Sequence, residues 1–223
     1  MSLAEPAPRR RRFPGVRAPK RLLTPDAERS LTDRQREVID ALEGLVVASA
    51  LSELTMAEIA ARVNCSLRTL YGIAPSRDEL VLMVVDRRLH RIGRAAIEAV
   101  DASDSPLDAL RAYLSAASEA VQPTAVAFTE EFANVSGARP LLDGHEKYVM
   151  AVTRSLLDRA VAEGQIRPVD TAAFAHVLGG LGREFSRPAV SSSLAASPKD
   201  TADAVKELEI HCQQKSPERM NNA

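Results

Sequence analysis

The chain has 223 residues, of which 45% are hydrophobic and 26% charged, and its formal net charge at pH 7 is −1. This composition is typical of a globular protein that can build its own core. The sequence has no run of eighteen apolar residues that would span a membrane, and its opening MSLAEPAPRRRR lacks the apolar stretch of a secretory signal. Two cysteines 147 positions apart (212 minus 65) and four histidines show no metal-ligand spacing. We therefore expect a cytoplasmic, reduced protein with no metal, no cofactor and no membrane partner.

Residues 1–30 form a separate, basic and proline-rich region. Up to Arg21 the chain has seven basic residues and one acidic residue, and five prolines lie within its first 25 residues. Such a segment is poor in apolar side chains, so we expect it to be extended and disordered. The last residues of the chain, 216–223, are expected to form a flexible tail.

Residues 31–78 are predicted to form three short helices. The first begins after Thr32, a favourable N-cap, and carries apolar side chains at steps of three and four residues. The second begins after Thr55, because Glu58 lies three residues further on and completes a capping box. The third begins after Ser66, which is again a favourable N-cap.

The second and third of these helices have the spacing of a helix-turn-helix. Asn64 stands at the turn, and Asn is one of the few residues that tolerate the left-handed conformation. Pro75 ends the third helix, and Ser76 with Glu79 forms a second capping box, from which a fourth helix begins. The alternative is an ordinary helical bundle whose outer surface is polar.

The side chains of the third helix favour DNA as the partner. Arg can bond guanine, Thr can bond a base edge or contact a thymine methyl group, and hydroxyl groups can reach phosphates. A helix N-terminus also offers its free N–H groups to a phosphate. The residues that we expect to contact DNA are Thr55, Met56, Ser66, Leu67, Arg68, Thr69, Tyr71 and Arg77.

The basic N-terminal region has two interpretations. It is either a solvated tail or an arm that follows the DNA backbone or enters the minor groove, with Arg17, Lys20 and Arg21 as contacts. Residues 1–80 carry 13 basic and 11 acidic groups, and the remainder carries 16 and 19. This asymmetry has the sign that DNA binding by the first part requires, but it does not decide between the two interpretations.

The run from Thr55 to Leu80 resembles the DNA-binding domain of the tetracycline-repressor (TetR) family. The positions that match the family pattern are Thr55, Ile59, Ala60, Ser66, Thr69, Leu70, Tyr71, Pro75, Ser76, Arg77, Glu79 and Leu80. The resemblance implies an all-α fold of about nine helices. It implies a three-helix DNA-binding domain over residues 31–78 and a larger helical domain, for effector binding and dimerisation, over residues 79–215.

The chain departs from the family pattern at several positions. Asn64 stands where the family usually has Gly, Cys65 where it has Val, and Ala74 where it has Phe. Ala50 replaces the Gly that commonly ends the first helix. Arg77 replaces a usual Lys, which keeps the charge but changes its geometry. None of these departures removes a predicted DNA-contacting group.

The rest of the chain is predicted to be helical, because no alternating strand pattern appears in it. From Ser76 the fourth helix runs to about Val100, and 25 residues of helix span about 37 Å, enough to connect a DNA-facing part to a separate body. Five further helices are predicted at residues 106–121, 123–136, 140–164, 170–187 and 199–214.

Three glycines, Gly179, Gly180 and Gly182, lie inside one of these predicted helices, where each costs roughly 1 kcal/mol relative to Ala. Either another helix approaches them closely or the helix is kinked or broken within the chain. The family resemblance implies that the approaching helix belongs to a second subunit, because the last two helices of the family pair with those of a second subunit. The residues expected at such an interface are Phe174, Val177, Leu178, Leu181, Gly182, Phe185, Val205, Leu208 and Cys212.

The resemblance also implies an effector cavity in the helical body. Arg139 and His145 would face an anionic ligand, although each candidate side chain is more often found at an ordinary core or surface position. The side chains that we expect to line the cavity are Tyr113, Phe128, Phe132, Arg139, His145, Tyr148 and Met150. The sequence does not identify the effector.

These features predict a one-component transcriptional regulator, most simply a repressor. It would bind a palindromic operator in double-stranded DNA as a homodimer and be released by a small-molecule effector. The alternative is a helical adaptor that uses the helix-turn-helix for protein contacts. No Ser/His/Asp arrangement, paired carboxylates or phosphate-binding loop is apparent, so we expect no enzymatic activity.

Overall fold

The computed structural model describes residues 13–48, 51, 54–118, 132 and 134–214. These residues confirm the predicted all-α class, because they contain no strand and only an isolated bridge between Ile166 and Gln214. Their helices, in chain order, are α1 (Pro25–Ser30), α2 (Asp33–Ala48), α3 (Met56–Arg62), α4 (Leu67–Tyr71), α5 (Arg77–Asp101), α6 (Pro106–Ala117), α8 (Ala138–Ala162), α9 (Thr171–Ser186), α10 (Pro188–Ser191) and α11 (Pro198–Gln213).

The helices begin close to the predicted positions because the signals that start them are local. Thr55 and Glu58 form the complete capping box of α3: the Thr55 hydroxyl accepts from the Glu58 amide, and the Glu58 carboxylate accepts from the Thr55 amide at 2.8 Å. The Ser66 hydroxyl accepts from the Thr69 amide at 3.0 Å and caps α4, and Ser76 caps α5 in the same way.

Two short helices, α1 and α10, were not predicted. The predicted helix at 123–136 lies almost entirely outside the described residues, as do the tail at 216–223 and residues 1–12 of the N-terminal region.

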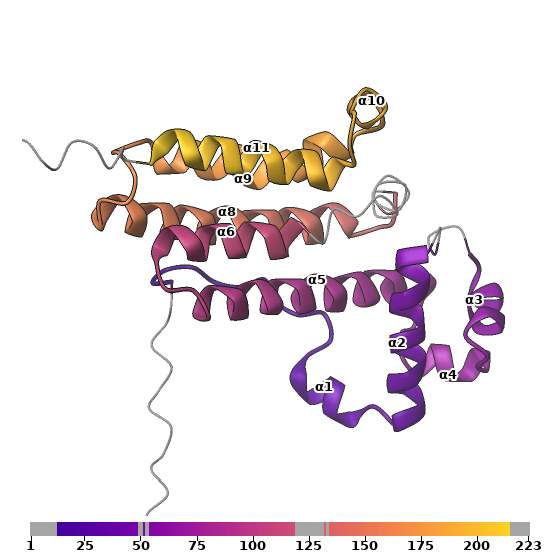
Figure 1. Ribbon diagram of the computed structural model, residues 1–223. Helices are drawn as coiled ribbons and strands as arrows, with labels where there is room; N and C mark the ends of the chain where they lie inside the picture. Colours follow the sequence, from indigo (N-terminus) through magenta and orange to yellow (C-terminus); the bar gives the residue numbers. More distant parts are fainter. Residues whose placement is uncertain (1–12, 49–50, 52–53, 119–131, 133, 215–223) are drawn as a thin grey trace, which may run out of the picture.

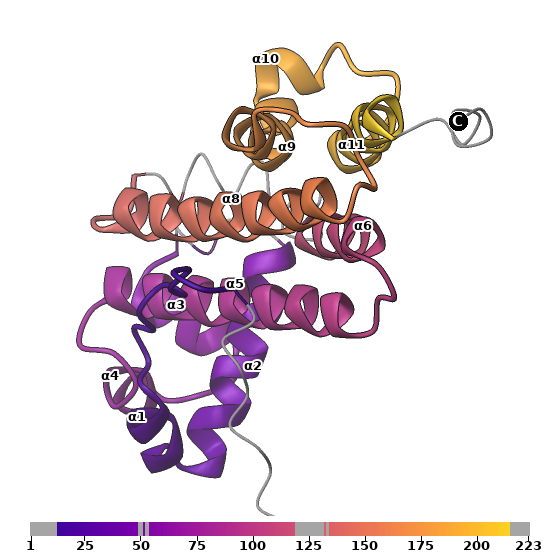
Figure 2. The same ribbon diagram turned by 90° about the vertical axis from the view of Figure 1, so that its left-hand side faces the viewer.

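The helices are arranged as a small head and a layered body that share the long helix α5 (Figure 1). The head contains α1 to α4 and lies beside the N-terminal half of α5. In the body, α6 and α8 form a layer over α5, and α9 and α11 form a further layer on the side away from α5 (Figures 1 and 2). In the part of the chain that the structure describes, no helix is both long and apolar enough to cross a bilayer.

Two hydrophobic clusters hold these parts together, and α5 contributes to both. The head cluster joins Leu42 of α2, Ile59 of α3 and Leu70 of α4 to the first half of α5. The body cluster joins Val100, in the second half of α5, to α6, α8, α9 and α11. The predicted domain boundary between residues 78 and 79 therefore falls at the start of a helix that both cores share.

The N-terminal region differs from its prediction over residues 13–30, which have defined positions instead of being disordered. Phe13 is 7% exposed and belongs to the body cluster, against which Val16 also packs. The chain then runs along α5 to α1 (Figure 1). Two main-chain bonds hold it there: the Leu22 amide donates to Asp86 at 2.9 Å, and the Pro19 carbonyl lies 3.1 Å from the His90 ring. We call residues 13–22 the strap.

Candidate functional site

The turn between α3 and α4 has the backbone geometry that a helix-turn-helix needs. Asn64 adopts a φ of 49°, the left-handed conformation predicted for it, and the Cys65 amide donates to the Ala60 carbonyl at 2.9 Å. Arg34 of α2 donates to the Asn64 carbonyl at 2.6 Å and so holds the turn against the first helix of the head. The sequence pattern did not single out Arg34, because only the fold brings it to the turn.

Helix α4 presents one side to the core and the other to solvent. Leu70 is fully buried in the head cluster. On the remaining surface, Leu67 is 43% exposed, Tyr71 is 54% exposed and the Arg68 side chain is also exposed. These three predicted DNA contacts therefore lie together on the outer surface of the head. A guanidinium, a phenol and an apolar side chain can bond a base edge, a phosphate and a thymine methyl group, respectively.

The other predicted contacts near α3 and α4 are occupied within the head. Met56 is buried in the core. The Thr55 hydroxyl donates to the Glu58 carboxylate at 2.7 Å, and the Ser66 and Thr69 hydroxyls bond each other at 2.9 Å. These side chains shape the helix ends, and their role in contacting DNA stays a prediction.

Arg77 takes part in a contact that the sequence did not predict. Its Nε atom donates to the Leu54 carbonyl at 2.8 Å, and its Nη1 atom lies 2.8 Å from the Asp78 carboxylate. The side chain is 30% exposed. Arg77 thus joins the residue before the α3 cap to the first turn of α5 and orients the helix-turn-helix.

The predicted contacts in the N-terminal region lie next to the body and α1. Arg17 and Lys20 are exposed on the strap, whereas Arg21 lies 3.6 Å from Glu28 of α1. The strap is bonded to α5, so the structure does not bring these three side chains beside α4.

The helix arrangement is similar to that of several solved regulators. A TetR transcription regulator from Haloarcula marismortui matches with a TM-score of 0.69 and 16% sequence identity, over 83% of this chain and 100% of that one. A TetR-family regulator from Agrobacterium tumefaciens gives 0.65 and 15%, over 82% and 98% of the two chains. AibR, solved in complex with isovaleryl coenzyme A and operator DNA, gives 0.58 and 18%, over 79% and 97%.

The chain has the fold of the TetR-family transcriptional regulators. The likeness is structural, since no protein-family sequence model and no curated protein sequence matches the chain. Helices α2 to α4 are those for which the sequence resemblance implies a DNA-binding domain, and α5 joins them to the body (Figure 1).

The side chains predicted to line an effector cavity of the TetR fold lie in different places. Tyr113 is buried in the body cluster, where Tyr148 packs against it, and burial raises the pKa of both phenols. Phe132 is fully buried in the head cluster, and Arg139 is exposed. Met150 of α8 is half-buried, and Phe128 lies outside the described residues. The structure therefore does not gather Tyr113, Phe132 and Arg139 around one space.

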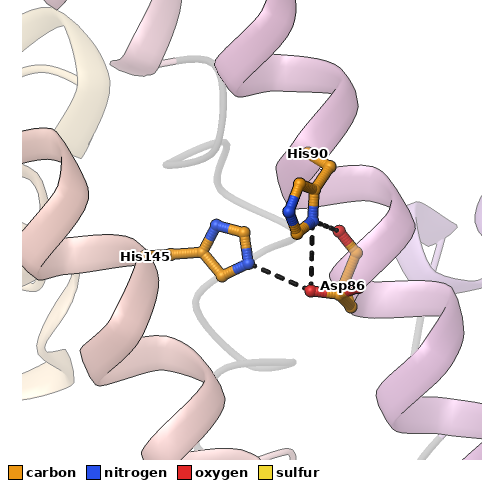
Figure 3. Close-up of side chains that lie close together, drawn as sticks. All are labelled: Asp86, His90 and His145. Atoms are coloured by element: carbon orange, nitrogen blue, oxygen red, sulfur yellow. Dashed lines mark hydrogen bonds and ion pairs between the residues drawn. The ribbon is translucent and has the colours of Figure 1, made fainter. Parts of the chain in front are cut away.

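His145, the remaining predicted effector residue, belongs to a polar cluster that the sequence did not predict. Its Nε2 atom lies 3.2 Å from Oδ1 of Asp86, and Nδ1 of His90 lies 3.1 Å from the same oxygen (Figure 3). The side chains of Asp86, His90 and His145 are 2%, 11% and 12% exposed. Asp86 and His90 stand four residues apart on α5, a spacing that could have indicated a shared helix face, whereas their proximity to α8 is a property of the fold.

The electrostatics of this cluster keep Asp86 ionised. Burial alone would raise its pKa, but hydrogen bonds from His145, His90 and the Leu22 amide outweigh burial and hold the pKa well below its usual range. The hydrogen bond to Asp86 raises the pKa of His90 against the opposing effect of burial. The cluster is therefore a buried carboxylate that faces two imidazoles.

A small cavity of about 130 Å³ lies beside Asp86 and His90, between α2, α5, α1 and the strap. Its charged lining contains carboxylates and guanidinium groups in almost equal number. The side chains around it are those of Arg21, Leu23, Glu28, Glu43, Asp86, Arg87, His90, Arg91 and Arg94.

The predicted dimer residues divide between the core and the surface of α9 and α11. Leu178 is 1% exposed and fills the chain's own body cluster, so it does not lie on an outer surface as predicted. Phe174 and Leu181 pack against the same cluster. Val177 of α9 and Leu208 of α11 are 49% and 63% exposed. Among the other predicted residues, Phe185 and Val205 are half-buried, Cys212 is exposed and Gly182 is buried.

The absence of a side chain at Gly179 of α9 has an explanation within the chain. A Cβ atom at Gly179 would lie 3.1 Å from Cγ of Met150, so α8 approaches α9 closely at this point. A Cβ atom at Gly180 would meet nothing within 4 Å. Because α9 is continuous from Thr171 to Ser186, the helix is not broken at its glycines.

Proposed function

We propose that this chain is a one-component transcriptional repressor. It binds a palindromic operator in double-stranded DNA as a homodimer, and a small-molecule effector releases it. The single observation that carries the proposal is the surface of α4. Its core-facing Leu70 is buried, while Leu67, Arg68 and Tyr71 are exposed side by side on a helix that a capped turn holds in place. The second helix of a helix-turn-helix lies in the major groove, where its side chains contact base edges.

The proposed homodimer is supported by the outer layer of the body. Val177 and Leu208 are large apolar side chains exposed on helices α9 and α11, which pack against each other. Exposed apolar side chains on adjacent helices favour association, because burial of each contributes on the order of 2 kcal/mol. This layer lies on the side of the body away from α5, so a partner there leaves both heads free (Figure 1).

The proposed release by an effector is supported by the connection of head and body through α5. A ligand that binds one arrangement of α5 better than another shifts the population between them and so changes the spacing of two heads in a dimer. AibR, which has a similar fold, was solved with both isovaleryl coenzyme A and operator DNA. The described residues support no particular effector.

Selection of bound fragments from sheared genomic DNA, with purified full-length protein at near-physiological salt, tests the proposal. Recovery of one palindromic site, competed by its own duplex but not by a scrambled duplex, supports a sequence-specific regulator. Uniform recovery that modest salt abolishes contradicts it, because it leaves only a non-specific electrostatic contact. No recovery at all leaves the helical adaptor as the better account of the helix-turn-helix.

The sign of regulation needs a second measurement. A reporter placed behind the recovered site is transcribed less when the protein is present if the protein is a repressor. Transcription that increases instead contradicts the repressor proposal while leaving DNA binding intact.

A further inference from the structure

We propose that Asp86, His90 and His145 form a binding site for a divalent transition-metal ion, with Zn²⁺ as the probe of choice. The site lies between the connecting helix α5, helix α8 and the strap. The proposal concerns metal binding alone, so it is independent of whether the chain binds DNA.

Two of the three separations between the ligand atoms are those that a small cation requires. Oδ1 of Asp86 lies 3.1 Å from Nδ1 of His90 and 3.2 Å from Nε2 of His145, and all three atoms lie within 4.8 Å of one another. Bonds of about 2.0–2.1 Å in a tetrahedral arrangement place ligand atoms roughly 3.3 Å apart. The two Asp86 distances already fit this value, and a cation can sit among the three atoms once the His145 ring moves toward His90 until their nitrogens lie about 3.3 Å apart.

The groups around the ligands orient them as outer-sphere partners orient metal ligands. The second carboxylate oxygen of Asp86 accepts from the Leu22 amide at 2.9 Å, which leaves Oδ1 directed at the two rings. Nε2 of His90 lies 3.1 Å from the Pro19 carbonyl, which can only accept, so this nitrogen carries a proton. A ligating His typically donates its other N–H to a backbone carbonyl or a carboxylate in this way.

The surroundings of Nδ1 in His90 also fit a bound cation. This nitrogen faces two acceptors, the main-chain oxygen of Asp86 at 2.9 Å and the carboxylate oxygen of Asp86 at 3.1 Å. Neither oxygen can donate, so only a cation, a proton or a metal ion, can occupy the space at Nδ1. The His145 ring meets the His90 ring edge-on, at 84° and 4.8 Å between centroids, and directs its Nε2 atom to the same Asp86 oxygen, Oδ1, that faces Nδ1 of His90 (Figure 3).

The donor set selects the class of ion. Two imidazole nitrogens and one carboxylate suit Zn²⁺ and neighbouring first-row ions, whereas Mg²⁺ and Ca²⁺ prefer oxygen ligands. Three protein ligands leave a fourth position of a tetrahedral ion for water or another small ligand. The competing account is a hydrogen-bonded Asp–His pair with a second His that binds no metal.

Isothermal titration of chelator-treated, full-length protein with Zn²⁺ tests the proposal. We expect about one Zn²⁺ ion to bind per chain, and we expect that Mg²⁺ does not displace it. The isosteric substitution Asp86→Asn, and His90→Gln and His145→Gln separately, should each weaken binding by roughly 100-fold, since loss of an outer-sphere partner alone costs 10–100-fold. Each variant is first checked for wild-type helicity by circular dichroism.

Matched controls come from the exposed groups of the same chain. His176 is exposed on α9, and His211 with Cys212 is exposed on α11, so these are the natural sites for adventitious zinc. The variants His176→Ala and His211→Ala with Cys212→Ser should bind zinc as the wild type does. Loss of binding in a control, with retention in His90→Gln and His145→Gln, overturns the proposal.

A measurement on the wild-type protein removes any dependence on whether the variants fold. Long-range proton–nitrogen NMR spectra of the imidazole groups distinguish Nδ1 from Nε2. Zinc should shift Nδ1 of His90 and Nε2 of His145 and leave His176 and His211 unchanged. The absence of these shifts at a zinc concentration equal to that of the protein shows that the cluster is a hydrogen-bonded network only.

Discussion

Glu43 of α2 and Arg87 of α5 form an ion pair of 2.7 Å in which the carboxylate side chain is only 4% exposed. Arg91, one turn further along α5, lies 2.7 Å from the other oxygen of Glu43. Arg87 also lies 2.7 Å from Asp40 of α2 and 3.5 Å from Glu28 of α1. These contacts join α1 and α2 of the head to α5 beside the head cluster, and Glu43 is the buried carboxylate among them.

The first prediction concerns this buried carboxylate. Glu43→Gln leaves Arg87 and Arg91 without their buried partner, and we expect a loss of about 2–3 kcal/mol in the free energy of unfolding. Removing one partner of a fully buried pair typically costs 3–5 kcal/mol, but the two guanidinium groups here are 28% and 60% exposed and stay partly solvated. Chemical denaturation in urea measures the effect.

The control for Glu43 lies on the same helix. Glu37 pairs with Arg34 at 2.8 Å, but both side chains are more than half exposed. Glu37→Gln should therefore change the free energy of unfolding by less than about 0.5 kcal/mol. Equal effects of the two substitutions would show that the Glu43 pair contributes no more than a surface pair does.

The second prediction concerns the strap, which was expected to be disordered. Phe13 is 7% exposed in the body cluster, so Phe13→Ala should lower the free energy of unfolding by about 2–4 kcal/mol. Leu22→Ala is the matched control, because that side chain is 51% exposed and its main-chain bond to Asp86 is retained. Thermal unfolding of both variants decides whether the strap packs on the body. If the strap is detached, the two substitutions should change the stability equally little.

The elements that could be predicted from sequence are those that local interactions determine. Thr55 and Ser66 begin their helices through hydrogen bonds to residues three positions away, and the positive φ of Asn64 follows from the need to end α3. Helix periodicity likewise indicates which side of α4 carries the buried Leu70. Each of these signals lies within one turn of helix and does not depend on the rest of the fold.

The features that could not be predicted depend on contacts between distant segments. The sequence around Phe13 is basic and rich in proline, and nothing in it shows that a body cluster will accept the ring. His145 was chosen for a cavity, but its partner Asp86 is 59 residues away on α5. Close approach of another helix was one of the two explanations for the glycines of α9, but the sequence does not show that Gly179 faces Met150 of α8 in the same chain.

The third prediction separates a DNA contact from an orienting role at Arg77. Because Arg77 bonds the Leu54 carbonyl and Asp78, Arg77→Gln should lower the free energy of unfolding by about 1–3 kcal/mol and weaken binding to all DNA sequences alike. The slope of log affinity against log salt should stay unchanged, whereas loss of a phosphate contact reduces it by about one. Arg62→Gln, at an exposed position of α3, is the control for stability.

The fourth prediction concerns Arg68, the exposed cation of α4. If Arg68 bonds a base edge, Arg68→Ala weakens binding to the selected operator by about 1–3 kcal/mol and relaxes base preference at one position in each half-site. Tyr71→Phe should weaken binding without changing preference, because a phenol hydroxyl reaches phosphates. Fluorescence anisotropy on a panel of single-base operator variants measures both.

The control for Arg68 lies on the body, away from the helix-turn-helix. Arg154→Ala removes a 59% exposed cation from α8 and should leave operator affinity unchanged. Equal weakening by Arg68→Ala on every sequence of the panel would identify Arg68 as a phosphate contact.

The last prediction concerns the proposed dimer. Leu208 of α11 is 63% exposed, and in a twofold dimer each interface contains two copies of it. Burial of each copy contributes on the order of 2 kcal/mol, and a carboxylate in its place adds a cost of desolvation. Leu208→Glu should therefore raise the dimer dissociation constant by about 100-fold or more.

The control variant Leu22→Glu, at a 51% exposed leucine of the strap, should leave the dimer dissociation constant unchanged. Sedimentation velocity over a series of concentrations measures both variants, and a Leu208→Glu protein that dimerises as the wild type does would show that the partner subunit does not pack over α11.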